Sequence, residues 1–548
     1  MRRARTRAAV RVKFRDGSVP AFFVCAAFFA AAMCLSCFSR CNGALSLWPK
    51  HVAAAGLQRA VVATDAAVLV GAMCVTRLLL GALAPEILAR NSRVLLLGIV
   101  ATCSELLSFG VVRAAAQIWP VLLPGSPPGF AHLAPFLLPV SFAPVLATLL
   151  CGSGAATALA FGLSAQALLL VPRPAALPAT LMSMAAAAAV PPAVARARDR
   201  AGVFRVFAVS GAVQTVMLLA SAPPFMRGIE EALKAPAGPQ PAVLGAALAI
   251  CAAGTLAVAP GHFATLGLLP LLEHLFAACS NLRLAKFADL RNPLLSRLAM
   301  EAPGTYHHSL VVANLASQAA DQIGANSLLC LVGGYYHDVG KLSNPANFTE
   351  NHLPGDVNPH DSLPPNLSAI ILASHVKDGV GQALDNNLPA PVRQIIREHH
   401  GTSKMAFFLN KARRLAAENA APGSDPDPVD ENQFRYAGPR PRTAESAIVS
   451  IADSVEAASR SLDKPSPAAI EKMVDGIVAA KAADGQFDEA PLTYAEVAEL
   501  RRAFTAALAT IRHARIAYPG SPAPAAPETK ENSGDQTDNN RQDAAPAR

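Results

Sequence analysis

Long apolar segments separated by short polar stretches fill the chain up to about residue 280. A helix that crosses a bilayer needs about 20 mainly apolar residues, and several segments approach that length. The candidates are residues 21–38, 60–84, 94–117, 132–151, 153–172, 175–195, 203–222 and 242–273. The last of these contains Pro260 and Pro270, so it is either one kinked helix or a span followed by an interfacial piece. The pattern predicts a polytopic helical membrane domain over residues 21–279, with about eight transmembrane helices.

After residue 280 the pattern changes to that of amphipathic helices. Residues 280–302 alternate apolar and charged positions at roughly helical spacing, which predicts an amphipathic helical connector. Helical patterns follow at residues 305–324, 327–340, 366–380, 390–401 and 443–460. Strand-type alternation is nearly absent, so the predicted fold class is all-α for both halves, with an all-helical domain over residues 303–518.

The composition agrees with this division, and the composition of the two chain ends differs from that of the domains. Apolar residues make up 52% of the chain and charged residues only 16%, which is typical of a membrane protein rather than a soluble one. Residues 1–20 are rich in arginine and form a basic N-terminus. Residues 420–442 are rich in proline and aspartate, as in a surface loop, and residues 519–548 are polar and proline-rich, which predicts a disordered tail.

The positions of the basic residues predict the topology. Lysine and arginine gather in the predicted loops 85–93, 196–202 and 280–291, whereas loop 118–131 contains neither. The positive-inside rule then places the N-terminus in the cytoplasm, and an even number of spans returns the second half there. We therefore expect a multi-pass protein of the inner (cytoplasmic) membrane, with the lipid bilayer as a partner. No basic patch with interleaved aromatics follows, so no nucleic-acid polymer is expected to bind despite the net charge of +8.

Four charged residues fall inside the predicted spans: Asp65, Arg77, Glu105 and Arg113. Charges in such positions often mark a ligand or ion path. The alternative is that they pair with one another or reach toward the membrane surface. The sequence leaves both interpretations open.

Cysteine and histidine are distributed in opposite ways. Nine of the ten cysteines lie in or beside the apolar half, so Cys330 stands alone in the second half. A cysteine-based zinc site or a disulfide scaffold is thereby excluded for the second half, and a reducing compartment is expected. Eight of the thirteen histidines, by contrast, fall between His307 and His400.

These histidines and two aspartates are embedded in the apolar sequence of the predicted helices. The set consists of His307, His308, His337, Asp338, His375, His399, His400 and Asp453. A lone histidine in such a helix is usually a satisfied core residue, but several buried imidazoles and carboxylates are costly unless something organises them. Divalent metals do so. Adjacent helix residues point about 100° apart, which favours two ions bridged by a carboxylate over one ion. A ligand set without thiolate favours Fe or Mn.

The motifs in this region also carry a family resemblance. The segments APGTYHHSLVVANLA, GGYYHDVGK, NPHDSLPPNLSAIILASHVKDG, IREHHGT and IADSVEAASR resemble the cytoplasmic domain of the seven-transmembrane receptors with an intracellular HD hydrolase. The resemblance covers residues 282–515, with a looser one through the membrane half. It implies a metal-dependent phosphodiesterase, with two divalent ions, that hydrolyses the cyclic dinucleotide cyclic di-AMP to linear pApA in second-messenger signalling.

The same resemblance implies roles for individual residues. One metal ion would be held by His308, His337, Asp338 and Asp453, and Asp338 would bridge to a second. The second ion would be held by Asp338, His375, His399 and His400. Lys341 would meet a substrate phosphate, with a solvated lysine at a helix end as the alternative, and Thr402 would help to position phosphate. Of the adjacent histidines, His308 rather than His307 is the expected ligand.

Two departures from the family pattern limit what the resemblance implies. The family usually has a large extracellular domain after the first span, but here only residues 39–59 separate the first two predicted spans. Ala444 stands where the family pattern leads us to expect lysine. Two other functions stay open: a membrane receptor that binds a nucleotide without cutting it, and an HD phosphohydrolase that acts on another nucleotide. The absence of a GYP motif after His400 argues against the cyclic di-GMP-specific relatives. Whether the chain forms a homo-oligomer is left open.

Overall fold

The structure is a computed structural model. It describes residues 55–88, 90–122, 138–170, 173–195, 200–220, 241–276, 278–353, 355–420, 425, 427–462 and 466–513. The predicted first span (21–38), the basic N-terminus (1–20) and the predicted disordered tail (519–548) lie outside these residues. Throughout the described part of the chain the secondary structure is helical, with one isolated bridge between Lys404 and Arg435 and no strand. The all-α prediction is confirmed for these residues.

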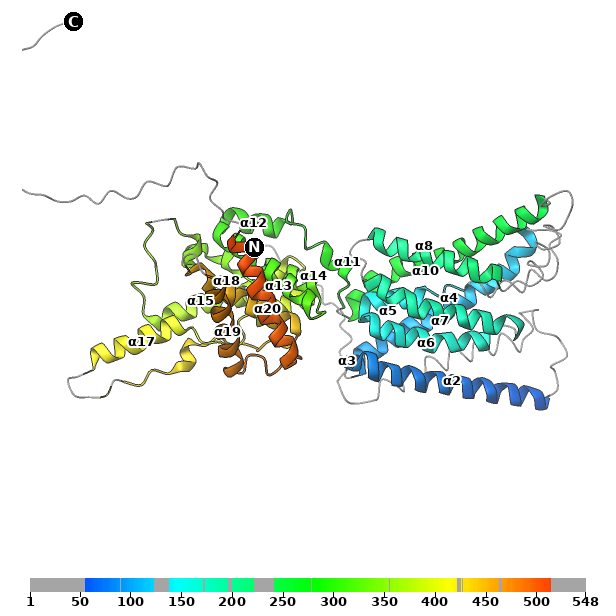
Figure 1. Ribbon diagram of the computed structural model, residues 1–548, viewed down its shortest axis with the longest axis horizontal. Coiled ribbons are helices and arrows are strands. Elements are labelled where there is room, and N and C mark those ends of the chain that lie inside the picture. The colour runs from blue at the N-terminus through cyan, green and yellow to red at the C-terminus, as the bar shows by residue number, and fades with distance from the viewer. Residues whose placement is uncertain are drawn as a thin grey trace, which may run out of the picture.

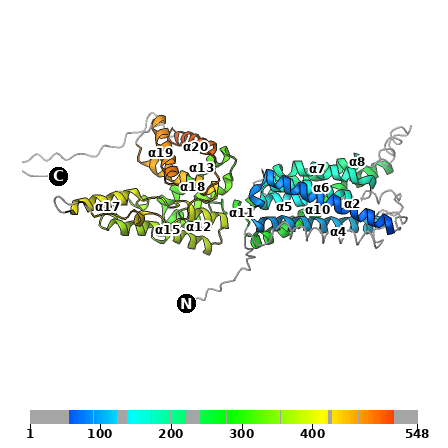
Figure 2. The ribbon, with the colours of Figure 1, turned by 90° about the horizontal axis from the view of Figure 1, so that it is seen from below.

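Two groups of helices form separate lobes that α11 connects (Figure 1; Figure 2). The N-terminal lobe consists of α2 (Ala55–Leu83), α3 (Pro85–Leu88), α4 (Asn91–Leu122), α5 (Phe142–Cys151), α6 (Ser153–Leu170), α7 (Arg173–Ala195), α8 (Arg200–Ala220) and α10 (Pro241–Phe276). The short helix α5 lies in the core of this lobe, because all of its residues are buried. Helix α10 is unbroken although it contains Pro260 and Pro270.

Helices coincide closely with most of the segments that hydropathy singled out. Predicted spans 60–84 and 94–117 correspond to α2 and α4, and span 242–273 corresponds to α10. For residues 132–151, the described helix is confined to α5. Within the ranges that the structure describes, no helix combines the length and hydropathy required to cross a membrane.

The connector consists of two short helices rather than one. Ser280 caps helix α11 (Asn281–Ala285), because its hydroxyl accepts a hydrogen bond from the Arg283 amide. Asn292 caps helix α12 (Pro293–Glu301), because its side chain accepts a hydrogen bond from the Leu294 amide. The first residue of the helix is a proline, as is favoured at this position. Buried leucines of α11 and α12 join the hydrophobic core of the second lobe.

The C-terminal lobe is built around α13 and α18. After α12 it contains α13 (Pro303–Gln322), α14 (Ser327–Tyr336), the short 3-10 helices η2 (Val339–Ser343), η3 (Pro345–Asn347) and η4 (Thr349–Asn351), α15 (Pro365–Asp385), α16 (Ala390–Glu398), α17 (Ala406–Asn419), η5 (Glu431–Phe434), α18 (Ala444–Arg460), α19 (Pro467–Ala483) and α20 (Tyr494–His513). Helix α13 packs against α14, α18 and α20. Thr443 caps α18 as predicted, because its hydroxyl accepts a hydrogen bond from the Ser446 amide.

Glycine permits the close approach of α13 and α14. A Cβ atom at Gly334 would lie 2.4 Å from the Cα of Ala313, far inside the contact distance of two carbon atoms. The obstacle is backbone, which cannot turn away as a flexible side chain could. Only glycine therefore fits here, three residues before His337.

We predict that Gly334→Ala destabilises the C-terminal lobe by about 1–3 kcal/mol through overpacking. The matched control is Gly381→Ala in α15, where an added Cβ meets nothing within 4 Å. That control is expected to be neutral or stabilising by about 0.5–1 kcal/mol, because alanine is the better helix former. Thermal unfolding of the two variants, followed by circular dichroism, measures the difference, and equal midpoints would contradict the packing argument.

Candidate metal centre

Five helices deliver histidine and aspartate side chains to one buried cluster in the C-terminal lobe. His308 comes from α13, His375 from α15 and Asp453 from α18, while His337 directly follows α14 and His399 directly follows α16. Asp338 and His400 are the next residues along the chain. All of these side chains are buried except that of His400, which is partly buried. The adjacent His307 is exposed, so His308 is the one of the two histidines that enters the cluster.

The carboxylate of Asp338 lies at the middle of the cluster. Its Oδ2 atom is 3.3 Å from Nε2 of His337 and 3.5 Å from Nε2 of His308. Its Oδ1 atom is 3.3 Å from Nε2 of His375 and 3.8 Å from Nε2 of His399. The two oxygens thus face two different pairs of imidazoles, so Asp338 could serve as a metal ligand together with either pair.

Local hydrogen bonds fix how the imidazoles point. The Nδ1 atoms of His337, His375 and His399 lie 2.8, 2.5 and 2.8 Å from the carbonyl oxygens of Gly334, Leu372 and Ile396. A carbonyl can only accept a hydrogen bond, so Nδ1 must carry the proton in each ring. Each Nε2 atom then presents its lone pair to the cluster, as a metal ligand must. In all three cases the carbonyl belongs to the residue three positions earlier, so the helix itself orients the ring.

His308 is oriented by a carboxylate instead. Its Nδ1 atom lies 2.6 Å from Oε2 of Glu456, and its Nε2 atom lies 3.1 Å from Oδ1 of Asp453. Glu456 also pairs with Arg460, at 2.7 Å. Because Asp453 and Glu456 are three residues apart on α18, they lie on the same face of that helix. A carboxylate behind a ligand histidine fixes its tautomer and increases its basicity.

The electrostatics of the cluster favour ionised carboxylates, neutral imidazoles at His375 and His399, and a positive charge on His337. Burial lowers the pKa of His399 to about 3 and also lowers that of His375. Burial opposes the ionisation of Asp338, but the neighbouring His337 and Lys341 outweigh it and hold its pKa well below the usual range. Burial likewise opposes a charge on His337, yet Asp338 and Asp453 raise the pKa of His337 to about 10. The carboxylates therefore attract positive charge into this buried space.

The donor atoms fit divalent metal ions. Two groups have ligand atoms that all lie within 4.8 Å of one another: Asp338, His375, His399 and His400 in one group, and His308, His337 and Asp338 in the other. Asp338 belongs to both. Its Oδ1 atom and Nε2 of His337 are buried without a hydrogen-bond partner, which is costly unless a cation binds there. Asp453 falls outside both groups but lies beside them, with an oxygen 3.8 Å from Nε2 of His337.

Lys341 lies against the cluster and not in open solvent. Its ammonium group pairs with Oδ2 of Asp338 at 2.9 Å and with Oε1 of Glu350 at 2.6 Å. Glu350 also accepts a hydrogen bond from the Thr305 hydroxyl at 3.1 Å. An ammonium group has three donors, so one N–H of Lys341 is left for a third partner. The structure thus places Lys341 among carboxylates, and not at a solvated helix end.

Thr402 follows His400 in a turn that side chains from farther along the chain hold in place. The buried Gln486 accepts a hydrogen bond from the Thr402 amide and donates one to its hydroxyl oxygen, both at 3.0 Å. Arg435 donates to the Thr402 carbonyl at 2.7 Å and pairs with Asp484 at 2.8 Å. The Thr402 hydroxyl keeps its own proton for another acceptor.

The ring of Tyr436 packs against the ring of His400. The two rings stack with their centroids 4.1 Å apart and an angle of 24° between their planes. The Tyr436 amide donates to the Ser403 carbonyl at 3.2 Å, which ties the tyrosine to the turn that carries His400. The segment 420–442, which its composition predicts to be a surface loop, therefore contributes Arg435 and Tyr436 to the surroundings of Thr402 and His400.

The structure brings together all of the residues that the sequence singled out as ligands. It adds Glu456, Glu350, Tyr436 and Gln486, which the sequence analysis missed. For Glu456 a signal existed, since it lies three residues after Asp453 in an apolar helix. No comparable signal marks Gln486, which lies 84 residues from Thr402.

Comparison with known proteins places two family models on the chain. The model described as "HD domain" matches residues 305–458, and the model described as "7TM receptor with intracellular HD hydrolase" matches residues 61–280. The first match covers most of the residues of the cluster, and the second covers most of the N-terminal lobe.

Two of the similar curated proteins are named as cyclic-di-AMP phosphodiesterases. The chain is 46% identical over 253 residues to "Cyclic-di-AMP phosphodiesterase PgpH" of Listeria monocytogenes. It is 44% identical over 254 residues to the protein of that name from Bacillus subtilis. Each match covers 46% of this chain and 34% of the relative, so the chain spans about a third of the length of the curated relatives it matches. A crystal structure of the L. monocytogenes PgpH HD domain in complex with cyclic-di-AMP is 46% identical; the match covers 40% of this chain and 97% of that one, with a TM-score of 0.37.

We predict that Glu456→Ala weakens the binding of Mn²⁺ about 10–100-fold, the usual cost of removing a carboxylate that orients a ligand histidine. The ring of His308 would lose its Nδ1 partner while every ligand atom stays in place. Titration of the metal-free protein with Mn²⁺, followed by calorimetry, measures the change. The control is Glu471→Ala on the exposed face of α19, and equal affinities of the two variants would show that Glu456 does not orient His308.

Proposed function

We propose that this chain, in which the two family models match residues 61–280 and 305–458, belongs to the family of seven-transmembrane receptors with an intracellular HD hydrolase and is a membrane-anchored, metal-dependent phosphodiesterase that hydrolyses cyclic di-AMP to pApA. The relatives that match it are named for cyclic di-AMP phosphodiesterase activity. The proposal places the C-terminal lobe in the cytoplasm, where a cyclic dinucleotide second messenger would reach it. The membrane would be the inner (cytoplasmic) one.

The observation that carries this proposal is the position of Asp338. A buried carboxylate whose two oxygens face separate pairs of imidazole Nε2 atoms is suited to two cations and not to one. We assign His308, His337, Asp338 and Asp453 to one ion, and Asp338, His375, His399 and His400 to the other. Nitrogen and oxygen donors without thiolate favour Fe or Mn. When bound, such ions make water a usable nucleophile near neutral pH and neutralise charge on phosphoryl oxygens.

Lys341 and Thr402 would bind and orient the phosphodiester. The remaining N–H of Lys341 is available to a phosphoryl oxygen, while its bonds to Asp338 and Glu350 hold the ammonium group in place. The hydroxyl of Thr402 would donate a second hydrogen bond, from a turn that Gln486 and Arg435 fix. Groups held in this way lose little side-chain entropy when the substrate binds.

Asp338 would have two effects on the reaction. It connects the two ligand groups, and its negative charge keeps Lys341 protonated, since the Asp338 and Glu350 charges outweigh burial and raise the pKa of Lys341. Hydrolysis adds one water across a phosphodiester bond: the bond from phosphorus to the ribose 3′ oxygen breaks, and the linear product keeps a terminal 5′ phosphate. The two alternatives, a receptor that binds without cutting and a hydrolase of another nucleotide, differ from the proposal in turnover and in substrate.

The first test follows cyclic di-AMP and cyclic di-GMP by chromatography, using the full chain in detergent micelles with Mn²⁺ or Fe²⁺. We expect cyclic di-AMP to be converted to pApA, and Asp338→Ala to abolish the conversion because both ligand groups lose their shared member. Asp385→Ala, at the exposed end of α15, is the control and should keep full activity. Tight binding of cyclic di-AMP without turnover would identify a receptor, and turnover of only another nucleotide would identify a different substrate.

A second test separates substrate binding from metal binding. Lys341→Met keeps most of the length of the side chain and removes the charge, and we expect kcat/KM to fall about 10–100-fold, as is typical for the loss of a charged hydrogen bond. Metal content, measured by atomic emission, should remain at the wild-type ratio because Lys341 is not a ligand. Loss of bound metal together with activity would instead mean that Lys341 serves only to hold Asp338.

A further inference from the structure

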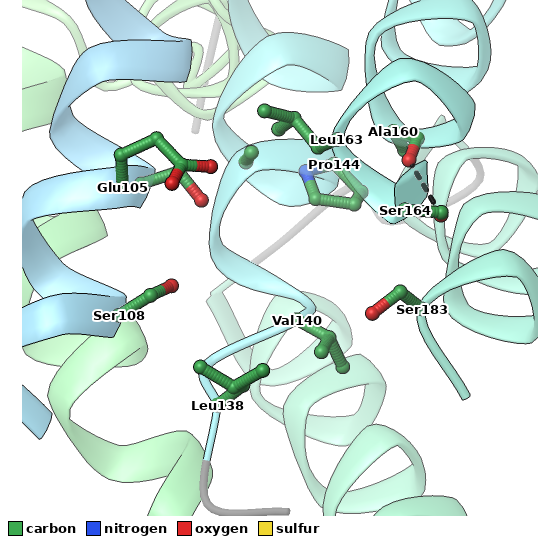
Figure 3. Close-up of a pocket in the computed structure, with 11 residues that line it drawn as sticks. Glu105, Ser108, Leu138, Val140, Pro144, Ala160, Leu163, Ser164 and Ser183 are labelled. Carbon is green, nitrogen blue, oxygen red and sulfur yellow. Dashed lines mark hydrogen bonds between the residues drawn. The ribbon is translucent and has the colours of Figure 1, made fainter. Parts of the chain in front are cut away.

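The N-terminal lobe contains a small polar cavity, which is separate from the metal centre of the C-terminal lobe. Its volume is about 40 Å³, and it lies where α4, the start of α5, α6 and α7 meet. Apolar side chains such as Leu138, Val140 and Leu163 form part of the wall. The polar part consists of Glu105 and the serines Ser104, Ser108, Ser164 and Ser183 (Figure 3).

The carboxylate of Glu105 lines this cavity without a partner. Glu105 is partly buried, and no hydrogen bond or ion pair joins its carboxylate to any other residue that the structure describes. The sequence analysis left open whether Glu105 pairs with another charge of the predicted spans. Among the residues that the structure describes in this lobe, no such pair forms with Glu105. A partly buried carboxylate that faces a polar cavity without a protein partner offers its oxygens to a bound cation.

The serine hydroxyls that line the cavity present hydrogen-bond acceptor oxygens to it. Ser164 donates its proton to the Ala160 carbonyl at 2.8 Å, and Ser183 donates its proton to the Ala179 carbonyl at 2.9 Å. Because a hydroxyl has one proton and two lone pairs, both oxygens can only accept from the cavity. The hydroxyls of Ser108 on α4 and Ser183 on α7 point toward one another across it (Figure 3).

The backbone at this place supplies few donors to Glu105. Helix α5 begins beside the cavity, and the free N–H groups of a helix start could in principle satisfy a carboxylate. However, the Phe142 amide already donates to the Pro139 carbonyl at 3.0 Å, and Pro144, which lines the cavity, has no N–H. The start of α5 is therefore a poor partner for the carboxylate.

We propose that this cavity is a binding site for a small monovalent cation, coordinated by Glu105 and by hydroxyl oxygens of Ser108, Ser164 and Ser183. Hard cations bind carboxylate and hydroxyl oxygens. One carboxylate balances one positive charge, so a divalent ion would leave an unbalanced charge in a largely apolar lobe. A water molecule needs about 10–15 Å³ of such volume. The cavity of about 40 Å³ therefore holds only a few water-sized groups and is too small for a nucleotide or a lipid headgroup.

The test uses the full chain in lipid nanodiscs and Na⁺, K⁺ or Li⁺ as the probe, at constant ionic strength made up with N-methyl-D-glucamine. We expect one of the three ions to raise Tm of the N-terminal lobe in a saturable way, because binding to the folded state alone stabilises it. Glu105→Gln, which keeps the shape and removes the charge, should abolish the shift. Equilibrium binding of that ion in radioactive form should give one ion per chain for the wild type and a large loss for the variant.

Two further variants keep the proposal falsifiable if Glu105→Gln does not fold. The double variant Ser108→Ala/Ser183→Ala removes two oxygens from the cavity and should weaken ion binding at least several-fold. Ser210→Ala is its matched control, because Ser210 also donates to the carbonyl one turn earlier, at 2.8 Å, but does not line this cavity. The proposal is overturned if no ion shifts Tm beyond N-methyl-D-glucamine, if all ions act equally, or if the shift persists in the Glu105 or serine variants.

Discussion

The arrangement of the C-terminal lobe depends on one buried carboxylate, that of Asp338. It has almost no contact with solvent, and the cost of burying its charge is offset only by cations or hydrogen-bond donors on every side. The lobe supplies the imidazoles of His308, His337, His375 and His399 and the ammonium of Lys341, from elements spread over about 90 residues. Helices α13 to α16 must therefore meet at this point, and the packing of Gly334 against Ala313 lets two of them do so.

Orientation of the ligands is a property of the helices as much as of the site. His337, His375 and His399 each bond through Nδ1 to the carbonyl three residues earlier, a partner that any histidine at the end or in the turn of a helix has within reach. The tautomer with a free Nε2 is thus set before any ligand binds. His308 does not use such a carbonyl and takes the Glu456 carboxylate as its partner instead. Preorganisation of this kind reduces the entropy lost on metal binding.

The sequence predicted the helices and the candidate ligands, but not the contacts that hold these side chains in place. Hydrophobic periodicity located α13, α15, α16 and α18 to within a few residues, because each is amphipathic and has a recognisable beginning or end, such as Thr443. Ligand candidates were visible because histidine and aspartate are unusual in apolar sequence. The Thr402–Gln486 pair was not, because it joins a turn to a residue after α19 and depends on tertiary packing. Periodicity also could not show that 280–302 divides into α11 and α12, since Lys286 to Arg291 keep the alternation without the helix.

Hydrogen bonds connect the end of α10, through the connector, to Tyr336, the residue that precedes His337. At the end of α10, Glu273 accepts hydrogen bonds from the amide of Ser280 at 3.0 Å and from its hydroxyl at 2.5 Å, which holds the start of α11 against α10. Beyond α11, the carbonyl of Phe287 accepts a hydrogen bond from the hydroxyl of Tyr336 at 3.1 Å, and Tyr336 immediately precedes His337. Helix α10 also packs against α4 and α5, the elements that line the Glu105 cavity. Glu273 and Tyr336 therefore hold the connector at both ends, one against α10 and the other beside the metal centre.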